Sequence, residues 1–175
     1  MEHVILVDEQ DNELGSMEKM EAHQKGLLHR AFSILIFNSK GEMLLQQRAD
    51  TKYHSAGLWT NACCSHPRPG ESILEAGKRK LQQEMGFVCE LNFSHKFIYR
   101  VELDNQLTEY EWDYVLIGNY DDAPAMNPEE GKDWKYQSVD SIIAETSKNP
   151  ENYTSWFKII LTHPHLQALV PQPEI

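Results

Sequence analysis

The order of the expected elements predicts a mixed α/β, or α+β, layered fold. Strand-like segments come first, an amphipathic helix stands in the middle, and helical segments end the chain. The length of 175 residues is typical of one domain, and no internal repeat or low-complexity segment divides the chain. We therefore expect a single compact domain over residues 1–175.

The N-terminal part predicts a strand and a β-hairpin. The apolar run at 3–8 is expected to form a short strand that ends in a turn at 11–15. The polar stretch 16–24 is ambiguous and is compatible with a turn of helix. Two apolar runs within 30–49 flank the tetrapeptide Asn38 to Gly41, a pattern typical of a hairpin.

The middle of the chain predicts one helix. Residues 57–64 are extended or looped, and a helix is expected over 72–86. Gly86 stands where a helix C-terminus favours a left-handed residue. An imperfect apolar stripe runs along this segment and consists of Ile73, Leu74, Ala76, Gly77 and Leu81.

The remaining segments complete the layers. Alternating or apolar residues predict two strands over 96–104 and 107–120, joined near Asp104 and Asn105. Helices are expected over 139–149 and 154–169, where apolar residues recur at helical spacing.

Charge and composition exclude several classes of partner. The formal net charge of −11 argues against binding to nucleic acid or to an anionic membrane, because both need a basic surface. No apolar run approaches the roughly 20 residues of a membrane helix. The acidic N-terminal stretch lacks the features of a secretion signal. We expect a cytoplasmic protein that binds neither nucleic acid nor membrane.

Two adjacent cysteines occur in the stretch TNACCSHP. Three cysteines, Cys63, Cys64 and Cys89, make a poor disulfide framework, so free thiols are expected. Neighbouring side chains of an extended backbone point in opposite directions, so only one of the adjacent thiols can face a pocket.

Five residues have side chains suited to a transition metal. Glu109 and Glu111 are two apart on an expected strand, so both carboxylates leave the same face. Imidazoles together with carboxylates suit zinc, manganese or iron. The candidate set consists of His23, His29, His66, Glu109 and Glu111. The alternative is that these residues are ordinary core histidines and a solvated strand face.

The expected helix at 72–86 and the loop before it resemble the Nudix box, a loop–helix motif that holds magnesium on a diphosphate. Ser65 takes the place of the first glycine of the motif, and Lys80 and Gln83 stand where hydrolases carry glutamates. The matching positions are Glu71, Arg79, Leu81, Glu84 and Gly86. A site with fewer carboxylates can grip a diphosphate but is poorly equipped to drive water onto phosphorus.

The altered box, combined with TNACCSHP, resembles the type I isopentenyl diphosphate isomerase family. Further matching segments, among them EYEWDYV at 109–115 and TSWF at 154–157, extend the resemblance over nearly the whole chain. It implies a Nudix-like mixed β-sheet sandwiched between helices. The implied reaction interconverts isopentenyl and dimethylallyl diphosphate by a 1,3-allylic proton shift in isoprenoid biosynthesis.

The resemblance also implies a role for each candidate residue. The acid–base groups would be Cys64, Glu111 and Tyr99. A site for zinc, manganese or magnesium would consist of His23, His29, His66, Glu109 and Glu111. Glu84 would hold a second cation, magnesium, on the substrate. The residues that meet the substrate would be Lys19, Arg48, Lys52 and Lys80 at the phosphates and Trp156 at the isoprenoid. A monomer or weak dimer is expected.

Two other functions fit parts of the pattern. A Nudix hydrolase of nucleoside diphosphate derivatives would release phosphate and tolerate loss of Cys64, but Lys80 and Gln83 speak against it. A metal-stabilised binding protein would use His23, His29 and His66 for zinc alone and would show no turnover.

Overall fold

The computed structural model describes residues 1–169, in which nine strands form one mixed sheet. The strands are β1 (His3–Val7), β2 (Glu13–Glu18), β3 (His29–Phe37), β4 (Glu42–Arg48), β5 (Trp59–Asn61), β6 (Cys63–Ser65), β7 (Asn92–Glu102), β8 (Thr108–Asn119) and β9 (Gly131–Ser138). The helices are α1 (Lys19–Lys25), α2 (Ile73–Met85), α3 (Val139–Lys148), the 3₁₀ turn η1 (Pro150–Asn152), α4 (Ser155–Thr162) and α5 (Pro164–Leu169).

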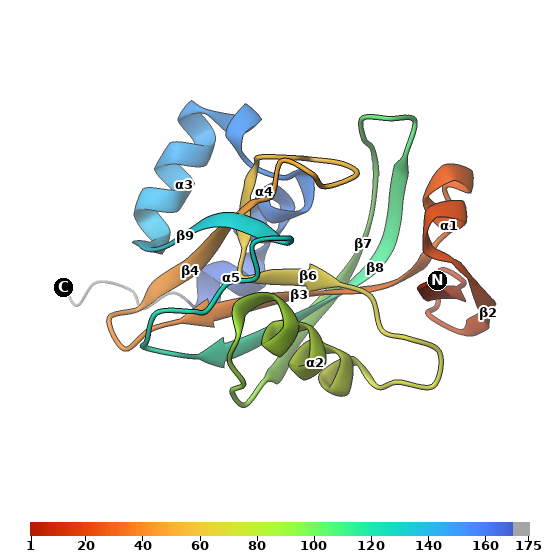
Figure 1. The fold of residues 1–175 in the computed structure, drawn as a ribbon, viewed down its shortest axis with the longest axis horizontal. Coiled ribbons are helices and arrows are strands. Elements are labelled where there is room, and N and C mark those ends of the chain that lie inside the picture. Colours follow the sequence, from red (N-terminus) through yellow and green to blue (C-terminus); the bar gives the residue numbers. More distant parts are fainter. Residues whose placement is uncertain (170–175) are drawn as a thin grey trace.

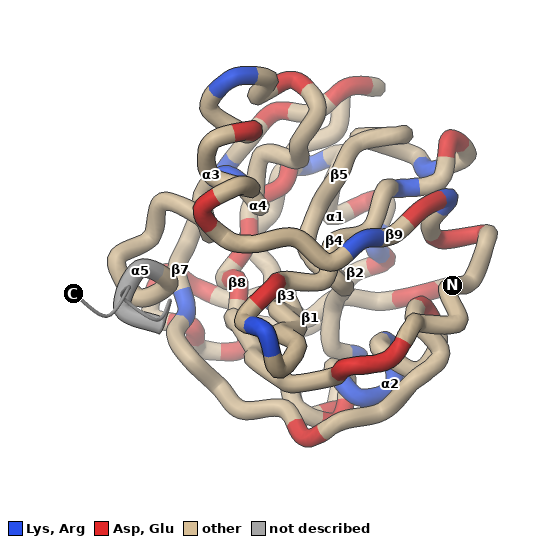
Figure 2. Tube along the Cα trace, turned by 90° about the vertical axis from the view of Figure 1, so that its left-hand side faces the viewer, with Lys and Arg blue, Asp and Glu red and all other residues tan. Residues whose placement is uncertain are grey.

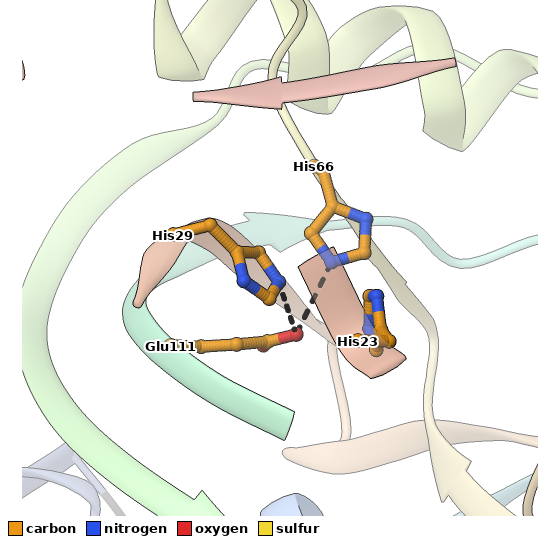
Figure 3. A group of neighbouring side chains, drawn as sticks. All are labelled: His23, His29, His66 and Glu111. Atoms are coloured by element: carbon orange, nitrogen blue, oxygen red, sulfur yellow. Dashed lines mark hydrogen bonds and ion pairs between the residues drawn. The ribbon is translucent and has the colours of Figure 1, made fainter. Parts of the chain in front are cut away.

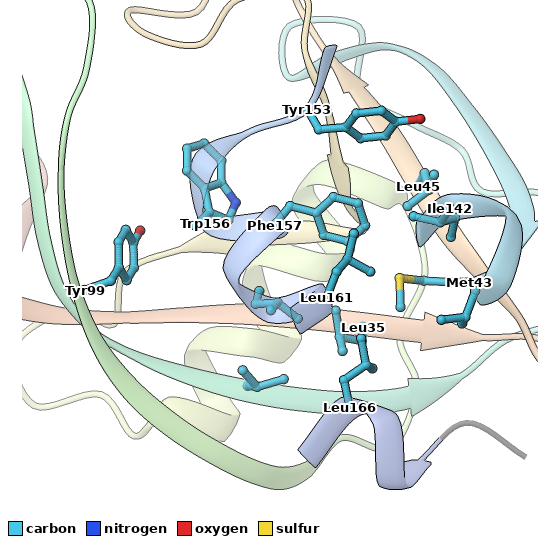
Figure 4. Close-up of a cluster of buried hydrophobic side chains, with 13 residues drawn as sticks. Leu35, Met43, Leu45, Tyr99, Ile142, Tyr153, Trp156, Phe157, Leu161 and Leu166 are labelled. Carbon is cyan, nitrogen blue, oxygen red and sulfur yellow. The ribbon is translucent and has the colours of Figure 1, made fainter. Parts of the chain in front are cut away.

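Helices cover both faces of the sheet, as expected (Figure 1). Strand β3 runs through the centre, parallel to β8 and antiparallel to β6. Its side chains alternate between two cores: Ile34 and Ile36 belong to the core with α2, and Leu35 belongs to the core with α3, α4 and α5. Figure 4 shows the second core, where Phe157 and Leu161 of α4 meet Leu35. Because β3 is buried on both faces, it is the central strand between the two helical layers of the α+β fold.

The predicted hairpin forms, but its two strands soon separate. β3 and β4 pair through Phe37 and Met43 beside the turn. β3 then pairs with β6 and β8, whereas β4 pairs with β5 and β9.

Helix α2 matches its prediction almost to the residue. Ser72 caps it in a reciprocal capping box with Glu75, and Gly86 ends it in the left-handed conformation with φ of 72°. Of the expected apolar stripe, Leu74 is exposed instead, while Met85 is buried. Gly77 faces the sheet so closely that a Cβ atom there would lie 2.8 Å from Leu116 Cδ1.

Two expectations about the secondary structure are wrong, and one strand was not predicted. The expected turn at 11–15 contains the start of β2, an exposed strand that pairs with β1 at the edge of the sheet. Strand β9 was not expected, because its sequence, GKDWKYQS, is mostly polar and it becomes a strand by pairing with β4. The expected helix over 154–169 is two helices, because α4 ends before Pro164, whose ring cannot continue it. Within residues 1–169, no helix is long and apolar enough to cross a membrane.

Candidate active site

A cavity of about 270 Å³ opens between the end of β4, strand β6, helix α2 and strands β7 and β8. Every site residue predicted from the sequence lines it, except His23 and His29, which are fully buried beside His66. The predicted residues on its wall are Lys19, Arg48, Lys52, Cys64, His66, Lys80, Glu84, Tyr99, Glu109, Glu111 and Trp156.

Three histidines converge on one carboxylate (Figure 3). The Nε2 atoms of His29 and His66 lie 3.3 and 3.1 Å from Oε1 of Glu111. One ligand atom from each of His23, His29, His66 and Glu111 lies within 4.8 Å of the other three. The register explains part of this arrangement, since His29 of β3 pairs with Glu111 of β8.

His23 and His29 each use the Nδ1 atom of the ring for a hydrogen bond to the backbone. Nδ1 of His23 lies 2.7 Å from the carbonyl oxygen of Lys19, and Nδ1 of His29 lies 2.8 Å from that of Leu27. Each Nδ1 therefore carries the proton and donates to a carbonyl, which leaves a lone pair on Nε2. Both Nε2 atoms are buried and have no hydrogen-bond partner within residues 1–169, although that of His29 lies 3.3 Å from Oε1 of Glu111. Two imidazole lone pairs directed toward a carboxylate oxygen are a suitable set of ligands for a divalent cation.

Protonation favours the same interpretation. Burial lowers the pKa of His66 to about 4, although Glu111 opposes the shift. Burial raises the pKa of Glu111 on its own, but the neighbouring imidazoles of His29 and His66 hold that pKa well below its usual range. Near pH 7 His66 is thus a neutral imidazole and Glu111 a charged carboxylate, the forms that bind metal.

Glu109 departs from the expected five-residue set. Glu109 belongs to a second group of possible metal ligands, in which its carboxylate and one ring nitrogen each of His23 and His54 lie within 4.8 Å of one another. The Tyr99 hydroxyl lies 2.8 Å from Oε2 of Glu109 and 2.9 Å from Oε2 of Glu111. One hydroxyl proton cannot serve both carboxylates fully, and burial together with the charge of Glu111 raises the pKa of Glu109 well above its usual range. Tyr99 therefore joins a carboxyl that favours protonation to one that favours ionisation.

The two adjacent cysteines face opposite sides of the sheet, as expected. Cys63 is fully buried in the core with α2, whereas Cys64 lines the cavity. The thiol of Cys64 donates to Oδ1 of Asn61 over 3.1 Å and accepts the indole N–H of Trp156 over 3.0 Å. Burial, together with Asp113, raises the pKa of Cys64, so the group is a neutral thiol near pH 7. All three cysteines are free.

Each predicted phosphate-binding lysine pairs with a carboxylate. Lys19 lies 3.1 Å from Glu2, and Lys52 lies 2.7 Å from Glu130. Lys80 pairs with Glu84 over 3.3 Å, one turn apart on α2. A diphosphate that enters the cavity would have to compete for these lysines.

Arg48 differs from the three lysines. Its guanidinium donates to the carbonyl oxygen of His54 and lies 5.3 Å from the ring centre of Trp156. Its Nε is buried and has no hydrogen-bond partner among the described residues. This N–H is available to an anion without the loss of an ion pair. Across the fold, acidic positions (red in Figure 2) are spread along the whole trace, and basic positions (blue) lie among them.

Four charged or titratable residues of the cavity wall were not predicted from the sequence: Glu2, Tyr53, His54 and Glu130. His54 is buried, lies 3.3 Å from Glu109, and has its pKa lowered to about 3 by burial and by Arg48. Glu130 comes from the loop before β9 and pairs with Lys52. His54 belongs to the same segment as Arg48 and Lys52, which was a usable signal, whereas nothing near Glu130 in the sequence marked it.

Comparisons with known proteins identify the domain and its fold. The NUDIX domain family matches residues 27–157. Among solved structures, a protein of Deinococcus radiodurans superposes with a TM-score of 0.77 at 17% identity, covering 91% of this chain and 97% of its own. A MutT protein of Methanosarcina mazei superposes with a TM-score of 0.68 at 18% identity, covering 82% and 96%. These likenesses show that the fold is that of Nudix proteins.

Relatives with higher identity narrow the family. An isopentenyl-diphosphate Delta-isomerase of Serratia proteamaculans is 51% identical over 160 residues, which is 91% of this chain and 89% of the relative. An isopentenyl-diphosphate Delta-isomerase 2 of Photorhabdus laumondii is also 51% identical over 160 residues, covering 91% and 90%. The chain belongs to the isopentenyl-diphosphate Delta-isomerase family, which here carries a NUDIX domain.

Proposed function

We propose that this protein interconverts isopentenyl and dimethylallyl diphosphate by a 1,3-allylic proton shift, acting as one domain over residues 1–175. The observation that carries the proposal is that a neutral thiol, Cys64, and the carboxylates joined by Tyr99 line the same cavity. A proton shift needs one group that gives a proton to the alkene and another that takes one from the neighbouring carbon.

Protonation of an unactivated alkene makes a tertiary carbocation that water would trap. The cavity wall near Cys64 must therefore exclude water and stabilise the carbocation, in addition to supplying the acid–base groups. Trp156 is nearly fully buried, and its indole π-system favours a nearby cation. Our proposal gives proton exchange at one end of the shift to the Sγ of Cys64 and at the other to the carboxyl of Glu111, with Tyr99 as the connecting hydroxyl.

The His23, His29, His66 and Glu111 cluster would hold a zinc, manganese or magnesium ion, with Glu109 on the same strand face beside it. A bound cation would lower the proton affinity of the Glu111 carboxyl and make it a stronger acid. His23 and His29 support this role because their Nδ1–H groups are held by backbone carbonyls.

The diphosphate would occupy the basic part of the cavity. Arg48 offers a free N–H, and three lysines would exchange their carboxylate partners for phosphate oxygens. Glu84 would hold magnesium on the diphosphate, and release of Lys80 from Glu84 frees that lysine for the phosphates. We further propose that the protein works in the cytoplasm as a monomer or weak dimer and binds neither nucleic acid nor membrane. The net charge of −11 supports the last point.

The test is proton exchange with solvent. The metal-loaded protein is incubated with isopentenyl diphosphate and Mg²⁺ in deuterated water, and the products are examined by NMR and mass spectrometry. We expect deuterium at the allylic carbons and no release of phosphate. Products without deuterium, or phosphate release in place of isomerisation, would overturn the proposal.

A matched pair of variants tests the thiol. Cys64→Ala is expected to reduce turnover nearly to background while the metal content stays unchanged. Cys89→Ala removes a half-buried thiol that does not line the cavity and is expected to leave turnover unchanged. Full activity of Cys64→Ala would remove the thiol from the mechanism.

A further inference from the structure

A second group of histidines lies outside the cavity. It joins His95 of β7 to His163, which follows α4, and to His165 of α5. One ring nitrogen from each of the three lies within 4.8 Å of the other two. None of these residues lines the active-site cavity or belongs to its metal cluster.

Two irregularities of the backbone bring the group together. The register of β7 against β8 shifts between Phe93 and His95, and this bulge leaves Phe93 exposed and turns His95 inward. At the other side of the group, α4 ends at Thr162 and α5 begins at Pro164. The break directs His163 and His165 toward His95, with ring centres 4.3 and 4.9 Å from that of His95.

His95 carries the feature that points to a ligand. Its residue exposure is 5%, and its Nε2 has no hydrogen-bond partner among the described residues. Its Nδ1 lies 2.9 Å from the Ser94 hydroxyl, so only the second nitrogen lacks a partner. An orphaned ring nitrogen in a buried position costs free energy unless something occupies it.

The protonation of the group suits a cation. Burial, together with the neighbouring His163 and His165, lowers the pKa of His95 to about 4. Burial also lowers the pKa of His163. Near pH 7 these two rings are therefore neutral, and a neutral imidazole has the lone pair that binds metal. Because the His95 ring stacks on the rings of both His163 and His165, simple packing of imidazoles is the alternative.

We propose that His95, His163 and His165 form a second metal site that takes a divalent transition-metal ion such as Zn²⁺, Ni²⁺ or Cu²⁺. Imidazole suits these ions, whereas Mg²⁺ prefers oxygen. Ligand nitrogens about 2.0–2.1 Å from a tetrahedral zinc ion lie about 3.3 Å apart. His163 is only partly buried and His165 is exposed, so both rings have room to rotate toward the ion. Water would complete the coordination.

Such an ion would clamp the C-terminal helices to β7. His95 and Tyr99 share the inward face of this strand, four residues and therefore about 13 Å apart. Trp156 of the cavity wall belongs to α4, the helix that ends at the clamp. The second site is thus placed to stiffen two elements that build the active site, although the proposal does not depend on the isomerase reaction.

The experiment counts bound zinc. Tag-free, metal-stripped protein is titrated with Zn²⁺ by calorimetry, and the saturated protein is analysed by elemental mass spectrometry. We expect His163→Ala and His165→Ala each to bind one equivalent less than the unaltered protein. His3→Ala, which removes an exposed histidine of β1, serves as the control and is expected to bind as many equivalents as the unaltered protein.

Thermal unfolding provides a second measurement. His165 is exposed, so His165→Ala is expected to fold normally, which circular dichroism checks. The rise of the unfolding temperature with added Zn²⁺ should be several degrees smaller in this variant than in the unaltered protein, because one stabilising ion is lost. Equal stoichiometry and equal thermal shifts in all four proteins would overturn the proposal. Those outcomes would leave the deuterium-exchange test of the isomerase unaffected.

Discussion

The indole N–H of Trp156 donates a hydrogen bond to the sulfur of Cys64 across 3.0 Å. The contact joins α4 to β6 through two residues that lie 92 positions apart in the chain. It occupies a lone pair of the sulfur while the thiol proton points to Asn61. Trp156 therefore has a direct relation to the proposed acid–base group, beyond the expected cover over the isoprenoid, which stays a prediction.

Loss of this hydrogen bond should slow turnover. We expect Trp156→Phe to lower kcat by about tenfold, because a hydrogen bond of ~1.4 kcal/mol to the reacting sulfur corresponds to one order of magnitude in rate. Steady-state kinetics measure the effect. Trp134→Phe, a partly buried tryptophan of the opposite core, is the control. Equal kcat in the two variants would contradict a role for the indole N–H.

Removal of metal should destabilise the protein through the His23, His29, His66 and Glu111 cluster. A chelator is expected to lower the unfolding temperature by roughly 5–10 °C, because an ion at about 100 times its dissociation constant stabilises only the folded state. His29→Ala should lose most of this response. His165→Ala, whose change lies outside the cluster, should keep a clear response in scanning calorimetry; loss of it there would contradict the assignment.

Glu84 should determine how much Mg²⁺ the protein needs for turnover. We expect Glu84→Gln to raise the Mg²⁺ concentration for half-maximal turnover by about tenfold or more, equivalent to ~1.4 kcal/mol, because Mg²⁺ relies on few carboxylates besides the phosphates. The measurement is turnover against Mg²⁺ with the histidine site saturated. Glu90→Gln removes an exposed carboxylate beyond the same helix and should leave the curve in place.

Gly86 should be essential for stability. A Cβ atom there would lie 2.6 Å from the carbonyl oxygen of Ala125, and the backbone φ of 72° already disfavours other residues. We expect Gly86→Ala to lower the free energy of unfolding by about 2 kcal/mol or more in urea titrations. Gly70 has a similar φ of 81° with nothing within 4 Å of its Cβ position, so Gly70→Ala should cost about half as much. A larger loss for Gly70→Ala would contradict the steric argument.

Acid should weaken the contact between Glu71 and Arg79. Hydrogen bonds from Arg79, 2.8 Å at each of two nitrogens, hold the pKa of Glu71 below its usual range. A group whose pKa is lowered on folding stabilises the protein above its unfolded pKa, near 4.3, and that contribution disappears as the pH falls through the folded pKa. The free energy of unfolding of Glu71→Gln should therefore lie below that of the unaltered protein at pH 6 and approach it near pH 3. A difference that is constant with pH would contradict this linkage.

Local patterns predicted most of the fold. An imperfect apolar stripe and Gly86 predicted α2, and a turn tetrapeptide predicted the hairpin of β3 and β4. These signals act between residues close in the chain, so the sequence shows them directly. Strand β9 carries too little apolar pattern to be recognised alone, because its strand state comes from pairing with β4, about 90 residues earlier.

The sequence by itself determined the chemistry available to this protein: the three histidines, the paired glutamates, the adjacent cysteines and the altered box that places it in its family. Only the tertiary structure decided the orientation, the protonation and the partners of those groups. It turned Cys64 toward the cavity and Trp156, and burial raised the pKa of that thiol. It also gave each of the three predicted phosphate-binding lysines a carboxylate partner. It also added His54 and Glu130 to the wall. Burial and hydrogen-bond partners arise between segments distant in the chain, and the chain order alone does not contain those distances.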